Sequence, residues 1–398
     1  MVVLLLCCLL LINTFAYTSV FADEFTEEET FVPVFSTPSV SVIKLKPSSI
    51  NAIAGLVMDA KSGRVLYEKN GYTRRPMAST TKIMTATLAI EKGNLDDIVV
   101  VSKKAADTWG SDISLKTGEK LTLRELLYGL MLNSGNDAAV AIAEHIGGSV
   151  EEFSKMMNKK AKELGCSNTS FSSPHGLDMP DHYTTAYELA LITRYALKNP
   201  TFSKIVSTKN MNISGRGLNN TNEMLGVYPG VNGVKTGYTG LAGRCLVTSA
   251  TRNNLQVISV VLGSPTRNAR AQSSKVLLDY TFNNFKPYTL VKAGTLLGQM
   301  AVIRGIKGTV PIAAVESITV PLSEEEANTI QTQVTYPDNM PAPVNADIEV
   351  GSIKFLINGT LIAESSLKTT EDVRRKTMMD YLYDIIKSWG GIMRNQTA

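Results

Sequence analysis

A serine followed three positions later by a lysine can perform nucleophilic catalysis, and this pairing occurs three times in a chain of 398 residues. The hydroxyl can attack a carbonyl carbon, and a neutral amine within hydrogen-bond distance can take its proton. The three copies are Ser79 with Lys82, residues 41–44 and residues 365–368. Spacing alone does not choose among them, so the choice depends on the element that carries each copy.

Two further motifs follow the Ser79 copy along the chain. Residues 134–136 (Ser-Gly-Asn) supply a second hydroxyl and an amide, and residues 235–237 (Lys-Thr-Gly) supply a cation and a hydroxyl. The Ser-x-Asn spacing also recurs at residues 49–51, and Lys-Thr-Gly recurs at residues 116–118. The three motifs therefore have to be chosen by their positions.

The Ser79 copy is the one that a predicted helix can organise. Ser79 comes shortly after Pro76 and just before a strong helical pattern over residues 82–92. Its hydroxyl then lies at the positive end of the helix dipole, on the same face as Lys82. The copy at 41–44 lies in a Ser/Pro/Thr-rich segment and the copy at 365–368 in a polar connection. Neither of these can hold a nucleophile and a base in place.

The other two motifs lie where a cleft can form. Residues 134–136 end an apolar helix predicted over 122–132, and residues 235–237 precede a predicted hairpin over 241–262. A loop and a sheet edge can both face the helix that starts near Ser79. The copy at 116–118 leads into a helix through charged residues and is typical of a surface turn.

The remaining periodicity predicts an α+β fold. Short β-rich runs at 52–58 and 64–68 predict a first hairpin, and a helical block separates them from the hairpin at 241–262. This order suits an antiparallel β-sheet covered by helices, with an inserted helical subdomain. Short apolar runs separated by Gly and Pro after Phe285 predict a small all-β C-terminal domain. Helices are predicted at 82–92, 122–132, 138–146, 150–164, 185–197 and 269–282.

The chain is long enough for more than one domain, and its ends differ in character from its body. An apolar core at 2–11 and the small residue Ala22 predict a secretory signal peptide, because the core is short for a membrane span. The predicted segments are the signal peptide 1–22, an acidic then Ser/Pro/Thr-rich tether 23–48, a main domain 49–285, a β-rich domain 286–370 and an amphipathic helix 374–394.

Composition excludes several function classes. A net charge of +4 with no dense basic tract in the body of the chain argues against nucleic-acid binding. The three histidines have no metal-ligand spacing, and no nucleotide-binding glycine loop occurs, so neither a metal nor another cofactor is expected. After removal of the signal peptide only Cys166 and Cys245 remain, as one bridge or as two separate buried thiols.

The three motifs in this order resemble those of the penicillin-recognising serine acyltransferases. The longer matches are similar to low-molecular-mass penicillin-binding proteins of the D-alanyl-D-alanine carboxypeptidase type, and the resemblance runs from about residue 50 to the C-terminus. These matches are Pro76–Thr85, Ser134–Ala138 and His175–Asp178. The resemblance implies the fold of that family and cleavage of the bond between two terminal D-alanines of a peptidoglycan stem peptide, with β-lactams as covalent inhibitors.

The resemblance also implies the catalytic roles. Ser79 would attack the carbonyl, Lys82 would take its proton, and Ser134 would relay a proton toward the leaving amine. Burial beside Lys235 would lower the pKa of Lys82, as a lysine base requires. The oxyanion hole would be the backbone N–H groups of Ser79 and Tyr238, where family members often carry His.

Substrate binding is implied for a second set of residues. Asn136 would hydrogen-bond the substrate amide and could also hold Lys82. Lys235 and Thr236 would bind the terminal carboxylate, helped by Arg270, which matches a family arginine. The implied substrate-binding residues are Asn136, Lys235, Thr236, Gly237, Tyr238 and Arg270.

Other functions are compatible with the same motifs, both other enzyme activities of this fold and a non-catalytic role. No Glu-x-x-x-Asn motif follows Ser134 within the predicted main domain 49–285, which argues against a class A β-lactamase. A transpeptidase would share the chemistry but use an amine acceptor, and a non-catalytic peptidoglycan-binding module would lack an intact motif set. His175, near Asp178, is interpreted as a structural histidine rather than a base, since Lys82 fills that role.

The C-terminal segment has the pattern of an amphipathic helix at a membrane surface. A basic stretch at 374–376 precedes a broad apolar arc within 378–393, with Trp389 among its members. The alternative is a helix packed on its own β-domain. The resemblance favours attachment to the outer face of the cytoplasmic membrane after export.

Overall fold

The structure, a computed structural model, describes residues 45–395, with the side chains described up to residue 389. The predicted signal peptide and most of the predicted tether lie outside the described residues. At the centre of the main domain is a five-stranded antiparallel sheet with the order β2-β1-β9-β8-β7. The strands are β1 (Ala54–Asp59), β2 (Val65–Lys69), β7 (Val231–Thr239), β8 (Gly243–Arg252) and β9 (Leu255–Ser264).

Local turn chemistry sets the register of the β8–β9 hairpin. Arg252 pairs with Leu255, so only Asn253 and Asn254 form the turn, with φ of +48° and +62°. Asparagine tolerates this left-handed region better than most residues, and the resulting turn matches the twist of the two strands. The predicted hairpin is confirmed, and β1 joins the sheet along β9 although the two strands are far apart in the chain.

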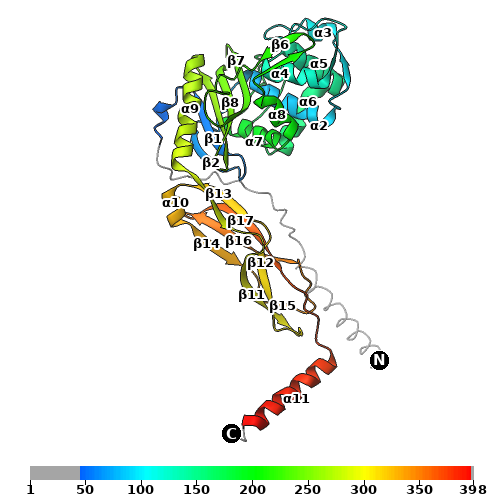
Figure 1. Cartoon of the computed structure of the whole chain (residues 1–398), viewed down its shortest axis with the longest axis vertical. Helices are drawn as coiled ribbons and strands as arrows, with labels where there is room; N and C mark the ends of the chain where they lie inside the picture. The colour runs from blue at the N-terminus through cyan, green and yellow to red at the C-terminus, as the bar shows by residue number, and fades with distance from the viewer. Residues whose placement is uncertain (1–44, 396–398) are drawn as a thin grey trace, which may run out of the picture. The chain divides into compact units, whose positions relative to one another are not determined.

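Both faces of the sheet are buried, and alternate residues of β9 serve different cores. Val257 and Val261 pack with Leu277 of α9 (Arg267–Asn284) on one face. Ile258 and Val260 face the larger core on the other side. That core includes α2 (Lys82–Lys92) and α7 (Ala186–Leu197). Figure 1 shows α9 and the helical block on opposite sides of the sheet.

The helical block between β2 and β7 starts its helices at side-chain caps. The Thr122 and Ser149 hydroxyls accept from backbone N–H groups at the helix N-termini, and Thr122 forms a reciprocal capping box with Glu125. The block contains α3 (Lys103–Ala106), α4 (Leu123–Leu132), α5 (Asn136–Gly147), α6 (Val150–Glu163) and α8 (Pro200–Ser207), with hairpins β3 (Ile98–Val100)–β4 (Lys120–Thr122) and β5 (Asn210–Ile213)–β6 (Arg216–Asn219). The short helix α8 and the two small hairpins were not predicted from the sequence.

The chain after α9 forms the predicted all-β domain around a core of its own. A two-stranded sheet pairs β10 (Lys286–Val291) with β13 (Ile318–Leu322), and α10 (Glu324–Thr329) follows β13. The larger sheet has the order β14-β16-β17-β12-β11-β15. Its strands are β11 (Leu296–Ile303), β12 (Thr309–Ala314), β14 (Gln331–Thr335), β15 (Asn339–Pro341), β16 (Glu349–Ile357) and β17 (Thr360–Thr369). The predicted fold class, α+β with a small all-β domain, is confirmed.

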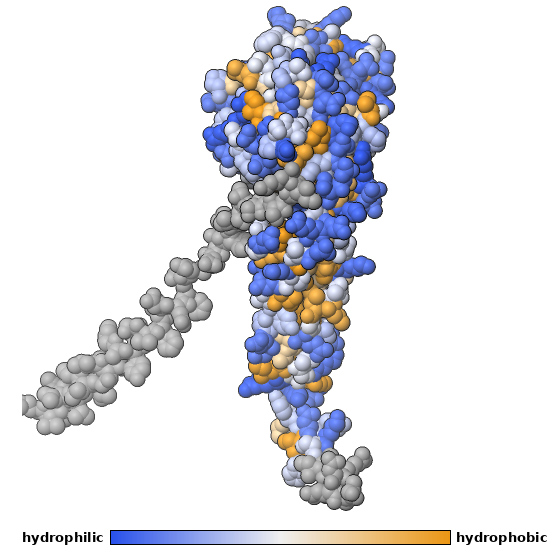
Figure 2. Space-filling model, turned by 90° about the vertical axis from the view of Figure 1, so that its left-hand side faces the viewer, coloured by the Kyte–Doolittle hydropathy of each residue, from blue (hydrophilic) through white to orange (hydrophobic). Residues whose placement is uncertain are grey.

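The last element is α11 (Met378–Asn395), in the segment predicted as an amphipathic helix. Its described apolar side chains are exposed, with Met378 at 86% and Trp389 at 70%. Within residues 45–395, no helix has the length and apolar character needed to cross a bilayer. By contrast, the face of the main domain drawn in Figure 2 is mainly hydrophilic with small hydrophobic areas.

Candidate active site

Ser79 lies in a single 3-10 turn, Ala78–Thr81, that runs directly into α2. Ala78 has φ of +49°, a left-handed conformation that costs a non-glycine residue about 1–2 kcal/mol. The Thr81 hydroxyl donates to the Ala78 carbonyl at 2.8 Å and holds this turn. Gly176 lies against the same carbonyl, where an added Cβ would stand only 2.0 Å away. The surrounding chain therefore fixes the turn that presents the Ser79 hydroxyl.

The Lys82 amine is fully buried and has three oxygen neighbours. Nζ lies 2.8 Å from Ser79 Oγ, 2.7 Å from Asn136 Oδ1 and 2.8 Å from the His175 carbonyl oxygen. Burial, followed by the positive charge of Lys235, holds the pKa of Lys82 well below its usual value. A neutral amine has two N–H groups and one lone pair, and the two carbonyl oxygens can only accept. Its lone pair is then left for the Ser79 hydroxyl.

The second motif occupies the bend between α4 and α5. Ser134 has φ of +65° and is buried, and Asn136 begins α5. Besides accepting from Lys82, the Asn136 side chain donates through Nδ2 to the Trp109 carbonyl at 2.9 Å. The adjacent Asp137 is buried and accepts from the backbone N–H groups of Ile113 and Leu115, which ties the loop before α4 to this bend.

The third motif lies on β7, whose backbone closely approaches the Ala78–Thr81 turn that carries Ser79. A Cβ added at Gly237 would stand 2.9 Å from Ser79 N and 3.0 Å from Ala78 Cβ. Only glycine allows this approach without displacing the turn. Next to it, the Tyr238 ring is 55% exposed and lies under the Arg244 guanidinium, with Cζ 3.6 Å from the ring centroid. The side chain of Tyr238 thus stays at the surface while its backbone lies beside the turn.

Lys235 and Thr236 lie inside the site. Lys235 is 1% exposed, and its Nζ donates to the carbonyl of Thr236 at 3.0 Å. Burial and then the positive charge of Arg270 lower the pKa of Lys235 to about 7. Lys235 is therefore a cation that can lose its charge near neutral pH, and Arg270 is near enough to affect it.

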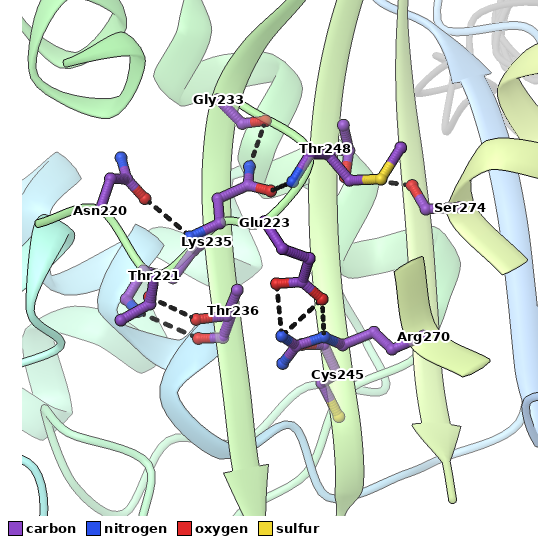
Figure 3. A network of polar contacts seen from close by, with 12 residues as sticks. Asn220, Thr221, Glu223, Gly233, Lys235, Thr236, Cys245, Thr248, Arg270 and Ser274 are labelled. Atoms are coloured by element: carbon purple, nitrogen blue, oxygen red, sulfur yellow. Dashed lines mark hydrogen bonds and ion pairs between the residues drawn. The ribbon is translucent and has the colours of Figure 1, made fainter. Parts of the chain in front are cut away.

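Arg270, in the first turns of α9, is held by a partner that the sequence reasoning missed. Glu223 lies in the segment before β7 and accepts from Arg270 Nε at 2.9 Å and from Nη2 at 2.7 Å (Figure 3). Arg270 Nη1 also donates to the Cys245 carbonyl at 3.3 Å. No local pattern marks Glu223, because its partner is 47 positions away in the chain.

Two histidines support the site without occupying a base position. The His175 ring accepts from the Leu177 N–H through Nδ1, and burial, then Lys82 and His182, lower its pKa to about 3. His182 Nδ1 accepts from the Ser172 N–H at 3.0 Å, so a neutral ring donates from Nε2 to Thr81 Oγ1, 2.7 Å away. His182 therefore reinforces the turn that carries Ser79, a role the sequence did not indicate.

The described serine–lysine copy outside the site lacks the serine–lysine hydrogen bond seen between Ser79 and Lys82. Ser365 lies on β17 with its hydroxyl donating to the Ser366 carbonyl, and Lys368 pairs with Asp347. Residues 41–44 lie outside the described residues. Cys166 and Cys245 are separate buried thiols rather than a bridge. Among residues 45–395, no group of three His, Cys, Asp or Glu side chains is arranged to hold a metal ion.

Comparison with known proteins gives the same family over nearly the whole chain. The family model of D-alanyl-D-alanine carboxypeptidases matches residues 41–266, and that of the C-terminal domain of penicillin-binding protein 5 matches residues 285–375. D-alanyl-D-alanine carboxypeptidase DacF of Bacillus subtilis is 37% identical over 349 residues, which cover 85% of this chain and 90% of the relative.

Solved structures agree with these matches. Penicillin-binding protein 5 of Haemophilus influenzae superposes with a TM-score of 0.74 at 32% identity, covering 83% of this chain and all of that one. A Streptomyces DD-transpeptidase variant superposes with a TM-score of 0.58 at 38% identity, covering 60% of this chain and all of that one. The resemblance inferred from the motifs is confirmed, and the chain belongs to the D-alanyl-D-alanine carboxypeptidase family of serine peptidases.

Proposed function

We propose that this protein removes the terminal D-alanine from peptidoglycan stem peptides through an acyl-enzyme on Ser79, with the chemistry in residues 49–285. The observation that carries this proposal is the buried Lys82 amine, 2.8 Å from Ser79 Oγ and flanked by two carbonyl acceptors. That arrangement suits a neutral lysine acting as a general base on a serine hydroxyl.

Acylation begins when Lys82 Nζ takes the proton of Ser79. The Ser79 oxygen bonds to the carbonyl carbon between the two D-alanines, and the carbonyl oxygen becomes negatively charged. The backbone N–H groups of Ser79 and Tyr238 stabilise this oxyanion, and the close approach at Gly237 supports such a pairing. The C–N bond then breaks, and the leaving amine takes a proton that Ser134 relays from Lys82.

Deacylation repeats the chemistry with water. Lys82, again neutral, removes a proton from water as the water oxygen attacks the ester carbon. The bond between this carbon and the Ser79 oxygen then breaks, and the Ser79 oxygen takes the proton back from Lys82. Asn136 holds Lys82 in place and faces the substrate amide in this scheme. β-Lactams acylate Ser79 by the same first step, and the lack of a Glu-x-x-x-Asn motif after Ser134 within residues 49–285 favours slow release of that adduct.

The terminal carboxylate of the substrate binds to Lys235 and Thr236, with Arg270 behind them. The low exposure of Lys235 supports this role because a carboxylate restores the charge balance of a buried cation. The Tyr238 ring is exposed and lies outside the carboxylate site. Tyr238 contributes only its backbone N–H, to the oxyanion hole.

Release of D-alanine from synthetic peptides tests the function directly. The purified protein is expected to release D-alanine from a peptide ending in D-Ala-D-Ala, and prior treatment with penicillin is expected to stop the release. A peptide ending in D-Ala-L-Ala is the matched control, and little or no L-alanine should be released from it. Release that stops after one D-alanine per protein molecule and resumes when an amine acceptor is added would favour acyl transfer without hydrolysis.

The pH dependence of kcat/KM is expected to reflect both buried lysines. Lys82 must be neutral to act as a base, and its lowered pKa makes the neutral form available at a lower pH than for an exposed lysine. Lys235 must be charged to bind a carboxylate, and its pKa of about 7 means that this charge is lost above that pH. We therefore expect kcat/KM to fall as the pH rises above about 7, whereas a constant value between pH 7 and 9 would contradict the role of Lys235.

We also propose that the protein is exported and attached to the outer face of the cytoplasmic membrane through α11. The exposed apolar side chains of α11 support this, as do the acidic residues of its other face, which pair with basic ones: Arg374 with Asp380 and Lys376 with Asp384. An amphipathic helix after a basic stretch binds at a lipid interface rather than crossing it.

Deletion of residues 377–398 is expected to move the mature protein from the membrane fraction to the soluble fraction. The separate catalytic site should keep its rate of D-alanine release. Replacement of Leu382 and Ile386 by glutamate, which keeps the helix length, is the matched control and should have the same effect. Sedimentation of the truncated, signal-cleaved protein with membranes would contradict the proposal.

A further inference from the structure

The nitrogens Nε, Nη1 and Nη2 of Arg270 all donate to groups of the protein itself. Its side chain is 4% exposed, whereas the Glu223 carboxylate that covers it is 24% exposed. Glu223 Oε1 accepts from both Nε and Nη2, Oε2 lies 2.5 Å from Nη2, and Nη1 donates to the Cys245 carbonyl. Glu223 thus pairs with the Arg270 guanidinium in the doubly hydrogen-bonded way that a substrate carboxylate would.

The segment that carries Glu223 also contacts the third motif. The Thr221 and Thr236 hydroxyl oxygens are 2.7 Å apart (Figure 3). Asn222 Nδ2 donates to the Gly233 carbonyl at 2.8 Å. Two of the three groups assigned to the substrate carboxylate, Thr236 and Arg270, are thus already engaged by neighbouring residues of one segment.

The charge of Glu223 bears on the same position. Lys235 and Arg270 are both buried cations, and the effect of Arg270 on the pKa of Lys235 places the two within electrostatic reach. Glu223 offsets one of these two charges. A carboxylate bound at Lys235 and Thr236 therefore meets less positive potential than the two cations alone would supply.

We propose that Glu223 is a positioning residue that holds Arg270 and sets the affinity of the site for a terminal carboxylate. This inference rests on the proposed function, in which that carboxylate binds at Lys235 and Thr236. The negative charge of Glu223 offsets the positive charge of Arg270. The site therefore binds the substrate carboxylate less tightly and releases the product carboxylate faster. Removal of the Glu223 charge leaves Arg270 available to the substrate.

Glu223→Gln tests the proposal because it removes the charge and keeps the shape. At a pH below about 7, where Lys235 keeps its charge, we expect KM for a peptide ending in D-Ala-D-Ala to fall about three- to ten-fold, with kcat changed less than about two-fold. Competitive inhibition by the same peptide with a C-terminal amide should be unchanged, since the amide has no carboxylate. Glu223→Asp, which keeps the charge, should remain within about two-fold of the wild-type KM.

Asp279→Asn is the matched control for loss of one negative charge. Asp279 lies on the same helix as Arg270 and accepts from Tyr228 and Lys275, not from the site. It should change neither KM nor the inhibition constant of the amide. An unchanged KM in Glu223→Gln, or equal changes for the acid and the amide, would overturn the proposal.

The remaining outcomes are also decisive. Glu223→Ser removes the charge with a smaller side chain and repeats the test if Glu223→Gln is unstable. Failure of both variants to fold would assign the ion pair to stability and overturn a role in affinity. A folded wild-type protein that releases no D-alanine would instead refute the proposed function, whatever the variants do.

Discussion

Replacement of Ser79 by alanine is expected to lower kcat/KM for D-alanine release by on the order of 10⁴-fold or more and to abolish covalent labelling by fluorescent penicillin. The reason is structural as well as chemical. The turn around Ser79 positions its hydroxyl 2.8 Å from the buried Lys82 amine. Alanine fits the turn without strain, so the loss would reflect the missing nucleophile.

Ser365→Ala is the matched control for this experiment. Ser365 begins another serine–lysine pair with the same spacing, but it lies on β17 of the C-terminal domain with its hydroxyl bonded to backbone. Its loss should leave D-alanine release within about two-fold of wild type, with at most the modest stability loss of a broken buried hydrogen bond. Persistent labelling of Ser79→Ala by penicillin would show that another residue is acylated.

Local sequence signals were enough to predict the elements that carry the motifs. Thr122 and Glu125 form the capping box that starts α4, and the helical pattern over 82–92 coincides with α2. The Asn253-Asn254 pair sets the turn of the β8–β9 hairpin. Each of these signals acts over a few residues, so the sequence contains the whole physical cause.

The partners that complete the site were not predictable in this way. Glu223 reaches Arg270, and His182 reaches Thr81 across 101 positions of chain. Trp109 contributes only its carbonyl to Asn136, which no side-chain pattern can reveal. Such contacts depend on how separate elements pack, and packing is a property of the folded chain rather than of any short segment.

The choice between hydrolysis and transpeptidation depends on what attacks the acyl-enzyme. A structurally similar Streptomyces protein is named a DD-transpeptidase, whereas the Bacillus subtilis relative is named a carboxypeptidase. The acylation chemistry around Ser79 and Lys82 serves both reactions. Partition of the acyl group of a D-Ala-D-Ala peptide between water and an added amine acceptor therefore measures a property of the residues around the motifs rather than of the motifs.

Replacement of Lys82 by arginine is expected to reduce kcat/KM by on the order of 10³-fold or more, even though the positive charge is retained. A guanidinium stays protonated at every accessible pH and cannot take the Ser79 proton. If Lys82 acted only as a positive charge, the arginine variant would keep much of the activity. The stopped-flow rate of acylation by a chromogenic β-lactam measures the step in which the proton is removed.

Two comparisons separate loss of the base from loss of the fold. Lys368→Arg, in the other serine–lysine pair, should leave acylation unchanged because Lys368 is part-exposed and pairs with Asp347. Lys82→Met, which has a similar length and no charge, should be as slow as Lys82→Arg. It avoids the buried guanidinium that Lys82→Arg introduces. Equal stability in thermal unfolding with unequal acylation rates, arginine fast and methionine slow, would contradict the base and assign Lys82 an electrostatic role. Slow acylation in both variants, with the folded state retained, requires a proton acceptor at this position.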